Sequence, residues 1–136
     1  MAKITIHNMH NHTAEEVFRA CLEPVLKRGT QASIDGGLCS YEKGCAAGQL
    51  LSAVEARAFD ELDEFDEFDE VDDKSWYYLV NSGLVPDHHC EVIAKAQFIH
   101  DQPYLVPPVR QARNYCKSQG WSSKWLEQFD ENMSLL

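Results

Sequence analysis

The chain has 136 residues, with 22 Asp and Glu against 12 Lys and Arg, so that its formal net charge is −10. This length fits one domain with a core of its own, and no run approaches the roughly 18 apolar residues of a transmembrane helix. The first residues, MAKITIHNMHNHT, lack the apolar stretch of a signal peptide, so we expect a single-domain cytoplasmic protein. The negative charge disfavours direct binding to nucleic acid or to a membrane.

The N-terminal part of the sequence predicts one short strand and one helix. Lys3–His7 alternates apolar and polar side chains, which is typical of a strand. Thr13 and Glu16 have the spacing of a capping box, which starts a helix. We expect Pro24 to kink this helix, because it cannot donate a helical hydrogen bond, and Gly29 to end it. The apolar positions of the helix recur at helical spacing: Val17, Phe18, Cys21, Leu22, Val25 and Leu26.

The middle of the sequence predicts a second strand and two more helices. Leu38–Tyr41 lies between two turn sequences and is predicted to be a strand. A helix is expected to open at Cys45 and to run to about Ala58. A short helix is expected at Ser75–Asn81, closed by Gly83.

The C-terminal part predicts three helices and completes the fold class. We expect helices at His88–His100 and at Val109–Gln119, the second of which stops at Gly120. Ser122 or Ser123 is expected to cap a last helix. That helix contains Trp125, Leu126 and Phe129. The prediction is therefore an α+β fold: a mostly helical single domain of five or six short helices with a small two- or three-stranded β-sheet.

One segment, residues 59–73, reads FDELDEFDEFDEVDD and has an apolar residue at every third position. A period of three matches neither the apolar stripe of a buried helix nor the alternation of a strand, so the segment is not predicted to belong to the core. It holds ten of the 22 acids. Because the other 12 acids equal the 12 Lys and Arg in number, this segment carries the whole charge excess of a neutral body.

Two interpretations of the acidic segment stay open. It is either a solvated low-complexity insertion over residues 59–74, or a docking surface for a partner protein with a basic surface. In the second case the acids steer the partner and the aromatic rings anchor it, and one version is mimicry of the phosphates of DNA. Calcium is disfavoured, because the loop lacks the glycine of an EF-hand. The predicted partner-binding residues are Phe59, Asp60, Glu61, Asp63, Glu64, Phe65, Asp66, Glu67, Phe68, Asp69, Glu70, Asp72 and Asp73.

The cysteines are odd in number and unevenly spaced, which is typical of reduced thiols packed as small apolar residues rather than of a disulfide framework. They are Cys21, Cys39, Cys45, Cys90 and Cys116.

Cys45 lies at a predicted helix start, where a thiol can be activated, so a nucleophile paired with His88, His89 or His100 is one hypothesis. Its best version uses Cys45 and His100. The sequence favours a structural role instead, because Cys45, Ala46, Ala47 and Gly48 are small enough for close packing. No motif of nucleotide-binding or hydrolytic enzymes occurs, so no catalytic residue is assigned.

A metal site is also considered, and none is assigned. Cys39 and Cys45 are too far apart in sequence for a zinc knuckle, although the run from His88 to Cys90 could add ligands. His7, His10 and His12 resemble a surface metal clip. No cofactor is predicted.

Several stretches in a fixed order carry a resemblance to known proteins. They are His12–Phe18, then Cys39-Ser-Tyr41 with Gly44-Cys-Ala-Ala-Gly48, then Gly83–Pro86 with Ala96–Asp101 and the helix of Trp125 and Leu126. Together they resemble a family of small bacteriophage and prophage accessory proteins with a Cys-x-Tyr…Gly-Cys-Ala-x-Gly motif. The structural motif residues carried over are Cys39, Tyr41, Gly44, Cys45, Ala46 and Gly48. The acidic triplets are an addition to the family pattern.

The resemblance implies a viral protein that works in the cytoplasm of a bacterial host, and it implies no reaction. We therefore expect a non-enzymatic phage-type accessory protein that binds and modulates a bacterial host protein through its acidic segment. An anti-defence inhibitor and a DNA mimic are two forms of this expectation. The alternatives are a small cysteine-dependent enzyme or redox protein that uses Cys45 with a histidine, and a structural or assembly factor.

Overall fold

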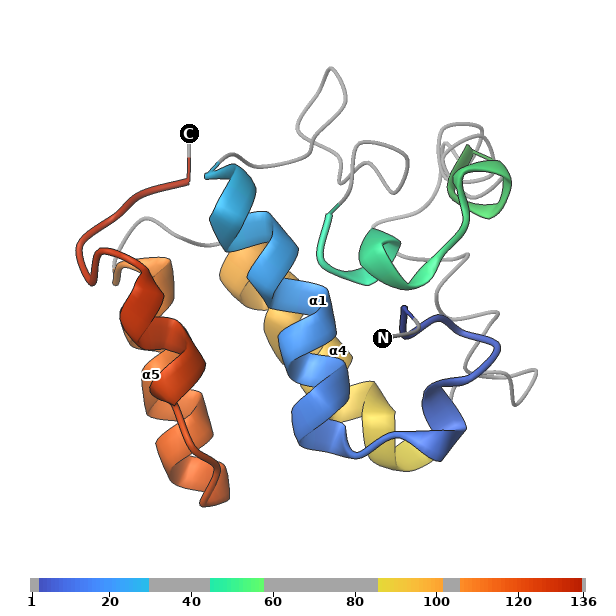
Figure 1. The fold of residues 1–136 in the computed structure, drawn as a ribbon, viewed down its shortest axis with the longest axis horizontal. Helices are drawn as coiled ribbons and strands as arrows, with labels where there is room; N and C mark the ends of the chain where they lie inside the picture. Colours follow the sequence, from blue (N-terminus) through green and yellow to red (C-terminus); the bar gives the residue numbers. More distant parts are fainter. Residues whose placement is uncertain (1–2, 30–44, 58–85, 102–105, 136) are drawn as a thin grey trace, which may run out of the picture.

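The computed structural model describes residues 3–29, 45–57, 86–101 and 106–135 (Figure 1). The regular structure of these residues is helical. The α-helices are α1 (Ala14–Arg28), α4 (Asp87–Asp101) and α5 (Pro108–Gln119), and residues 53–57 are helical as well. The 3-10 helices are η1 (Met9–Asn11), η2 (Ala47–Leu50) and η3 (Lys124–Gln128). None of the helices in the described ranges is long and apolar enough to cross a membrane.

The start and the end of α1 follow from the sequence. The N–H of Glu16 donates to the Thr13 hydroxyl at 3.2 Å, and the N–H of Thr13 donates to the Glu16 carboxylate at 2.9 Å, so the predicted capping box is confirmed. Gly29 ends the helix in a left-handed conformation with φ of 75°, which glycine adopts without strain. Pro24 lies inside α1, and the helix continues past it to Arg28.

The predicted α+β class is wrong for the described residues, which contain no β-strand. The expected strand Lys3–His7 is wrong: residues 3–5 have no regular structure, and a turn follows at residues 6–8. The Asn8 side chain accepts from the N–H of Thr5 at 2.8 Å, and the N–H of Met9 donates to the Thr5 carbonyl at 2.9 Å. Such local bonds compete with strand pairing. The N–H of Ile6 donates to the carbonyl of Leu50 at 3.0 Å, which links this segment to η2 without forming a strand. The expected strand Leu38–Tyr41 and helix Ser75–Asn81 lie outside the described residues.

The single helix expected from Cys45 to Ala58 is divided in two. The 3-10 turn η2 ends at Leu50, Leu51 has extended dihedral angles, and residues 53–57 then form a separate helical turn. Ser52 starts that turn through a second capping box. The N–H of Ser52 donates to the Glu55 carboxylate at 2.9 Å, and the N–H of Glu55 donates to the Ser52 hydroxyl at 3.2 Å. This second capping box begins a new helical turn at residues 53–57 and so separates it from η2.

The predicted helices of the C-terminal part are confirmed as α4 and α5. Pro108 occupies the first turn of α5, where its missing N–H costs no helical bond, and Gly120 ends the helix with φ of 76°. The last predicted helix is a 3-10 helix rather than an α-helix. The residue at its N-cap position is Ser123, whose side chain makes no capping hydrogen bond, so the predicted serine cap is wrong; the N–H of Lys124 donates instead to the Ser122 hydroxyl at 3.2 Å.

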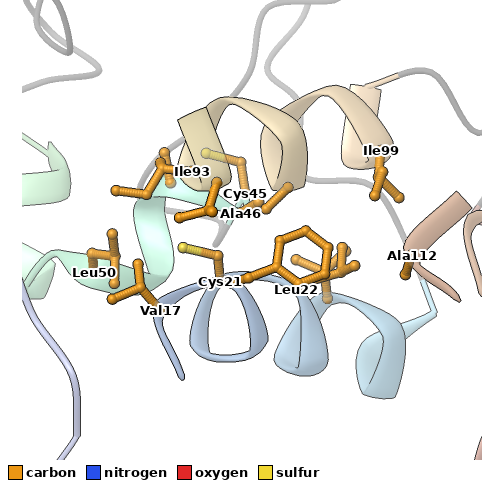
Figure 2. Close-up of a cluster of buried hydrophobic side chains, with 14 of the residues drawn as sticks. Val17, Cys21, Leu22, Cys45, Ala46, Leu50, Ile93, Ile99 and Ala112 are labelled. Carbon is orange, nitrogen blue, oxygen red and sulfur yellow. The ribbon is translucent and has the colours of Figure 1, made fainter. Parts of the chain in front are cut away.

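The core forms where α1 lies against α4. In Figure 1 these two helices occupy the centre, with α5 and η3 on one side and the N-terminal segment and η2 on the other. Figure 2 shows apolar side chains of α1, α4, α5 and the region of η2 pointing toward one another. The labelled residues are all buried: Val17, Cys21, Leu22, Cys45, Ala46, Leu50, Ile93, Ile99 and Ala112.

Aromatic rings extend this core to the C-terminal segment. The ring of Phe18 on α1 lies 5.0 Å from that of Tyr115 on α5, 6.0 Å from that of Trp121 and 6.4 Å from that of Trp125. The tilted and edge-on geometries are those that aromatic pairs prefer. Phe18 therefore ties α1 to both α5 and η3.

Candidate functional site

The acidic segment over residues 59–74 lies outside the described residues, and so do Cys39, Tyr41 and Gly44. The described part of the chain shows what several of the other acids do. On α1, Glu23 accepts two hydrogen bonds from Arg19, at 3.1 and 3.2 Å, and one from Gln128 at 2.9 Å. Near the C-terminus, Glu131 accepts from Arg113 at 2.6 Å. These carboxylates have partners within the body.

Two further acids serve as helix caps and as histidine partners. Glu16 lies 3.6 Å from the ring of His12, and its bonds to Thr13 hold the pKa of its carboxyl below the usual value. Glu55 lies 2.7 Å from Nε2 of His7. Partial burial works to raise the pKa of Glu55, but the Ser52 N–H and the His7 ring outweigh it and lower that pKa. The body thus uses these acids locally.

Cys45 and its small neighbours lie inside the core. Cys45 and Ala46 have no exposed surface, and Ala47 and Gly48 are buried. In Figure 2 Cys45 and Cys21 lie between α1 and α4. Burial, and to a smaller extent the neighbouring Cys45, raises the pKa of Cys21 far above that of a free thiol. A substrate cannot reach Cys45 in this arrangement, which counts against the nucleophile hypothesis and agrees with a packing role.

The histidines proposed as partners of Cys45 lie in different surroundings. His88 is exposed, whereas the adjacent His89 is buried, and the two ring centroids are 4.0 Å apart. Nε2 of His89 donates to the Met9 carbonyl at 2.7 Å, and Nδ1 is buried without a hydrogen-bond partner in the described part of the chain. Burial lowers the pKa of His89. His89 therefore fastens η1 to α4.

His100 belongs to a polar cluster that sequence analysis missed. Its Nδ1 lies 2.7 Å from the Asp101 carboxylate, which also accepts from the Gln97 amide at 2.8 Å. The carbonyl oxygen of Gln97 accepts from the backbone N–H of Ala47 at 3.0 Å. The cluster thus joins the end of α4 to η2. Its sequence signal is the pair of polar residues, Gln97 and His100, at helical spacing on the apolar side of α4.

The metal hypotheses find no support among the described residues. No three His, Cys, Asp or Glu side chains of those residues come together in a way that could hold a metal ion. His7 and His12 are paired with different carboxylates, Glu55 and Glu16, rather than with one common centre.

A groove among the described residues lies along α1. The N-terminal segment and η2 form its opposite wall, and its volume is about 360 Å³. The lining residues are Lys3, Ile4, Glu16, Arg19, Ala20, Glu23, Pro24 and Gln49.

No protein-family model matches the chain, and no curated protein or solved structure shows significant similarity to it. The resemblance to phage accessory proteins therefore rests on the sequence motifs alone.

Proposed function

We propose that this chain is a non-enzymatic accessory protein of phage type that binds a basic surface of a bacterial host protein through residues 59–73. One observation carries the proposal: the ten acids of residues 60–73 account for the whole net charge of −10. The resemblance supplies the bacterial setting. Modulation of a defence protein, or of a protein that handles nucleic acid, is the proposed consequence, since such proteins present basic surfaces.

The use of acids elsewhere in the chain supports this proposal. Glu16 and Glu55 cap helices, and Glu23 and Glu131 pair with arginines. Most basic side chains of the described residues are exposed, and the sequence scatters the 12 Lys and Arg rather than clustering them as a nucleic-acid groove does. These described acids thus have local roles, and the proposal assigns the external contact to residues 59–73.

The proposed mechanism separates attraction from anchoring. Carboxylates attract a basic surface over about a Debye length, roughly 8 Å at physiological salt, and raise the rate of association. Apolar side chains then supply most of the contact energy, and aromatic residues are common in that role. Phe59, Phe65 and Phe68 are the proposed anchors. Neutralising acids should thus change the association rate, whereas truncating rings should change the dissociation rate.

The first experiment identifies the partner. Wild-type protein and a variant without residues 60–73 are used for capture from a bacterial lysate, and a protein held by the first and not by the second is purified. Identical recoveries from both would contradict the proposal, because the acidic segment would then have no role in binding.

The second experiment tests the mechanism with that purified partner. One variant carries Asp66→Asn, Glu67→Gln, Asp69→Asn and Glu70→Gln. A control neutralises four acids of the body instead, Glu15, Glu91, Glu127 and Asp130, and has the same net charge. We expect the first variant to lose affinity and salt dependence, and the control to retain both. Equal effects of the two variants would show that only net charge matters and would overturn the site assignment.

A further inference from the structure

Although the Lys and Arg residues are scattered along the sequence, three of them share one face of α5. Arg110, Arg113 and Lys117 follow one another at intervals of three and four residues, which brings side chains to the same face of an α-helix. Arg110 and Lys117 are exposed, and Arg113 is half-buried. The helix advances about 10 Å over this interval, so these three cations form one short row, which we call the basic stripe.

No other helix of the described residues has an excess of positive charge. Helix α1 carries three acids and three bases, α4 carries three acids and one lysine, and η3 carries one acid and one base. By contrast, α5 contains no acid at all. Because the chain as a whole has a net charge of −10, the basic stripe is opposite in sign to the protein that carries it. Its electrostatic field attracts a ligand rich in carboxylates.

The contact with Glu131 shows that the basic stripe accepts a carboxylate. Oε1 of Glu131 lies 2.6 Å from Nη1 of Arg113 and 3.7 Å from Nε of Arg110. The Glu131 side chain is 48% exposed, so water screens this ion pair and another carboxylate can replace it. Lys117, one helical turn further along, is exposed and forms no ion pair with a described carboxylate. The stripe therefore has room for a ligand with several carboxylates.

The chain itself contains a segment of this chemistry. Residues 59–73 hold ten acids as five consecutive pairs, each preceded by an apolar residue. The described residues that flank this part of the chain are the helical turn at residues 53–57 and the start of α4. Figure 1 places both on the side of α1 that faces away from α5. A second copy can approach the basic stripe directly, so it is the better source of the acidic segment.

We infer that the basic stripe binds the acidic segment of a second copy of this chain. Two copies related by a two-fold axis make the contact twice, because each then offers its acidic segment to the stripe of the other. The incoming carboxylates displace Glu131 and also pair with Lys117. The inference rests on the proposed function, since it uses the same segment, and it adds a form of regulation: self-association competes with binding to the host protein.

The first test measures self-association of the purified full chain by sedimentation velocity, with no host protein present. Exposed ion pairs are weak and are screened by salt. We therefore expect the sedimentation coefficient to rise with protein concentration in about 0.05 M salt and to stay at the monomer value in about 0.5 M salt. A monomer at every concentration in low salt would overturn the inference. It would leave the proposed function standing, because that proposal is tested by capture of a host protein.

A triple variant tests the basic stripe against a control of equal net charge. The variant carries Arg110→Gln, Arg113→Gln and Lys117→Gln. The control removes three exposed lysines outside the stripe: Lys3→Gln, Lys27→Gln and Lys124→Gln. We expect the stripe variant to weaken self-association about tenfold, as the loss of three exposed ion pairs predicts, and the control to change it much less. Equal effects would show that only net charge matters, which would overturn the inference.

Two single substitutions change the binding in opposite directions. Lys117→Glu alters a side chain without a described partner, so it should weaken self-association while the melting temperature stays the same. Glu131→Gln removes the carboxylate that competes for the arginines, so it should strengthen self-association. Glu91→Gln, at an exposed position of α4, changes the net charge equally and is its control. If Glu131→Gln does not associate more tightly than Glu91→Gln, the ligand does not bind at the stripe.

A mixing experiment decides which copy supplies the acidic segment. The variant with Asp66→Asn, Glu67→Gln, Asp69→Asn and Glu70→Gln keeps its stripe, and the triple stripe variant keeps its acids. The first is labelled with ¹⁵N and titrated with the unlabelled second. We expect saturable amide shifts within α5 of the labelled protein. If the α5 shifts of the wild type instead differ from those of the acid variant at every dilution, the segment occupies its own stripe, which would overturn the assignment to a second copy.

Discussion

Nε2 of His89 lies 2.7 Å from the carbonyl oxygen of Met9, so a side chain of α4 binds a segment 80 residues earlier in the chain. The ring has no exposed surface, and its Nδ1 has no hydrogen-bond partner in the described part of the chain. Burial outweighs the bond to Met9 and lowers the pKa of His89 from its usual 6.5, and the nearby rings of His88 and His12 act in the same direction. The folded protein therefore favours neutral His89.

This arrangement predicts that acid destabilises the fold. Below about pH 6.5 the unfolded chain binds a proton at His89 that the folded chain resists, so the free energy of unfolding falls as the pH falls. One proton contributes at most about 1.4 kcal/mol per pH unit. His89→Gln keeps a donor for Met9 and cannot titrate, so urea unfolding between pH 5 and 8 should show a smaller slope. His10→Gln, at an exposed site, should keep the wild-type slope. An unchanged slope in His89→Gln would assign the acid sensitivity to other groups.

Gln97 is predicted to contribute to stability through the backbone of η2. Its side chain accepts from the buried N–H of Ala47 at 3.0 Å, and Gln97→Met leaves that donor without this acceptor. The expected cost is about 1–3 kcal/mol in urea unfolding at neutral pH. Gln97→Glu keeps an acceptor but places a second carboxylate beside Asp101, so its loss of stability relative to wild type should become smaller as the pH is lowered. Equal stability of Gln97→Met and wild type would contradict this role.

The capping box of α1 predicts a smaller and purely local effect. Thr13→Ala removes the hydroxyl that accepts from the N–H of Glu16, and we expect a loss of about 1 kcal/mol in thermal or urea unfolding. Thr13→Ser retains the hydroxyl and should lose little. If the serine variant is as unstable as the alanine variant, the cap is not the source of the effect.

The thiols of the described residues should differ in reactivity. Cys45 is completely buried. Burial raises the pKa of Cys116 to about 11, so only a small fraction of the Cys116 thiol is ionised at pH 8. Cys90 is half-buried and should react with iodoacetamide before Cys21, Cys45 or Cys116, as measured by mass spectrometry of peptides. Urea should remove the difference. Rapid labelling of Cys45 in the native protein would instead favour the nucleophile hypothesis.

Short sequence patterns predicted the helices correctly where residues close in sequence cap the ends of the helix. Thr13 and Glu16 complete the start of α1 without help from distant residues. Gly29 and Gly120 end their helices because each adopts the left-handed conformation that the stop requires. The Ser-x-x-Glu pattern at Ser52 was equally readable in the sequence, and its cap explains why the predicted helix from Cys45 is divided.

The predictions failed where local hydrogen bonds compete with strand pairing, and they missed contacts between residues far apart in the sequence. The alternating pattern of Lys3–His7 fits a strand, but the side chain of Asn8 bonds to the backbone first and produces a turn. The bonds from His89 to Met9 and from Gln97 to Ala47 join segments 80 and 50 residues apart, and no local rule predicts such pairs. The groove likewise depends on how the N-terminal segment returns to α1.

Because several cysteine thiols lie in the core, the rate at which the protein is oxidised depends on how often the core opens. Cys21, Cys45 and Cys116 are shielded from oxidants as long as α1, α4 and α5 stay together. An opening of the core exposes these thiols, and oxidation would then place a polar group where only an apolar one fits. A chain whose core thiol reaches the sulfinic or sulfonic level cannot recover the apolar side chain, so such an opening removes a molecule permanently. Survival under peroxide should therefore follow the population of the open state.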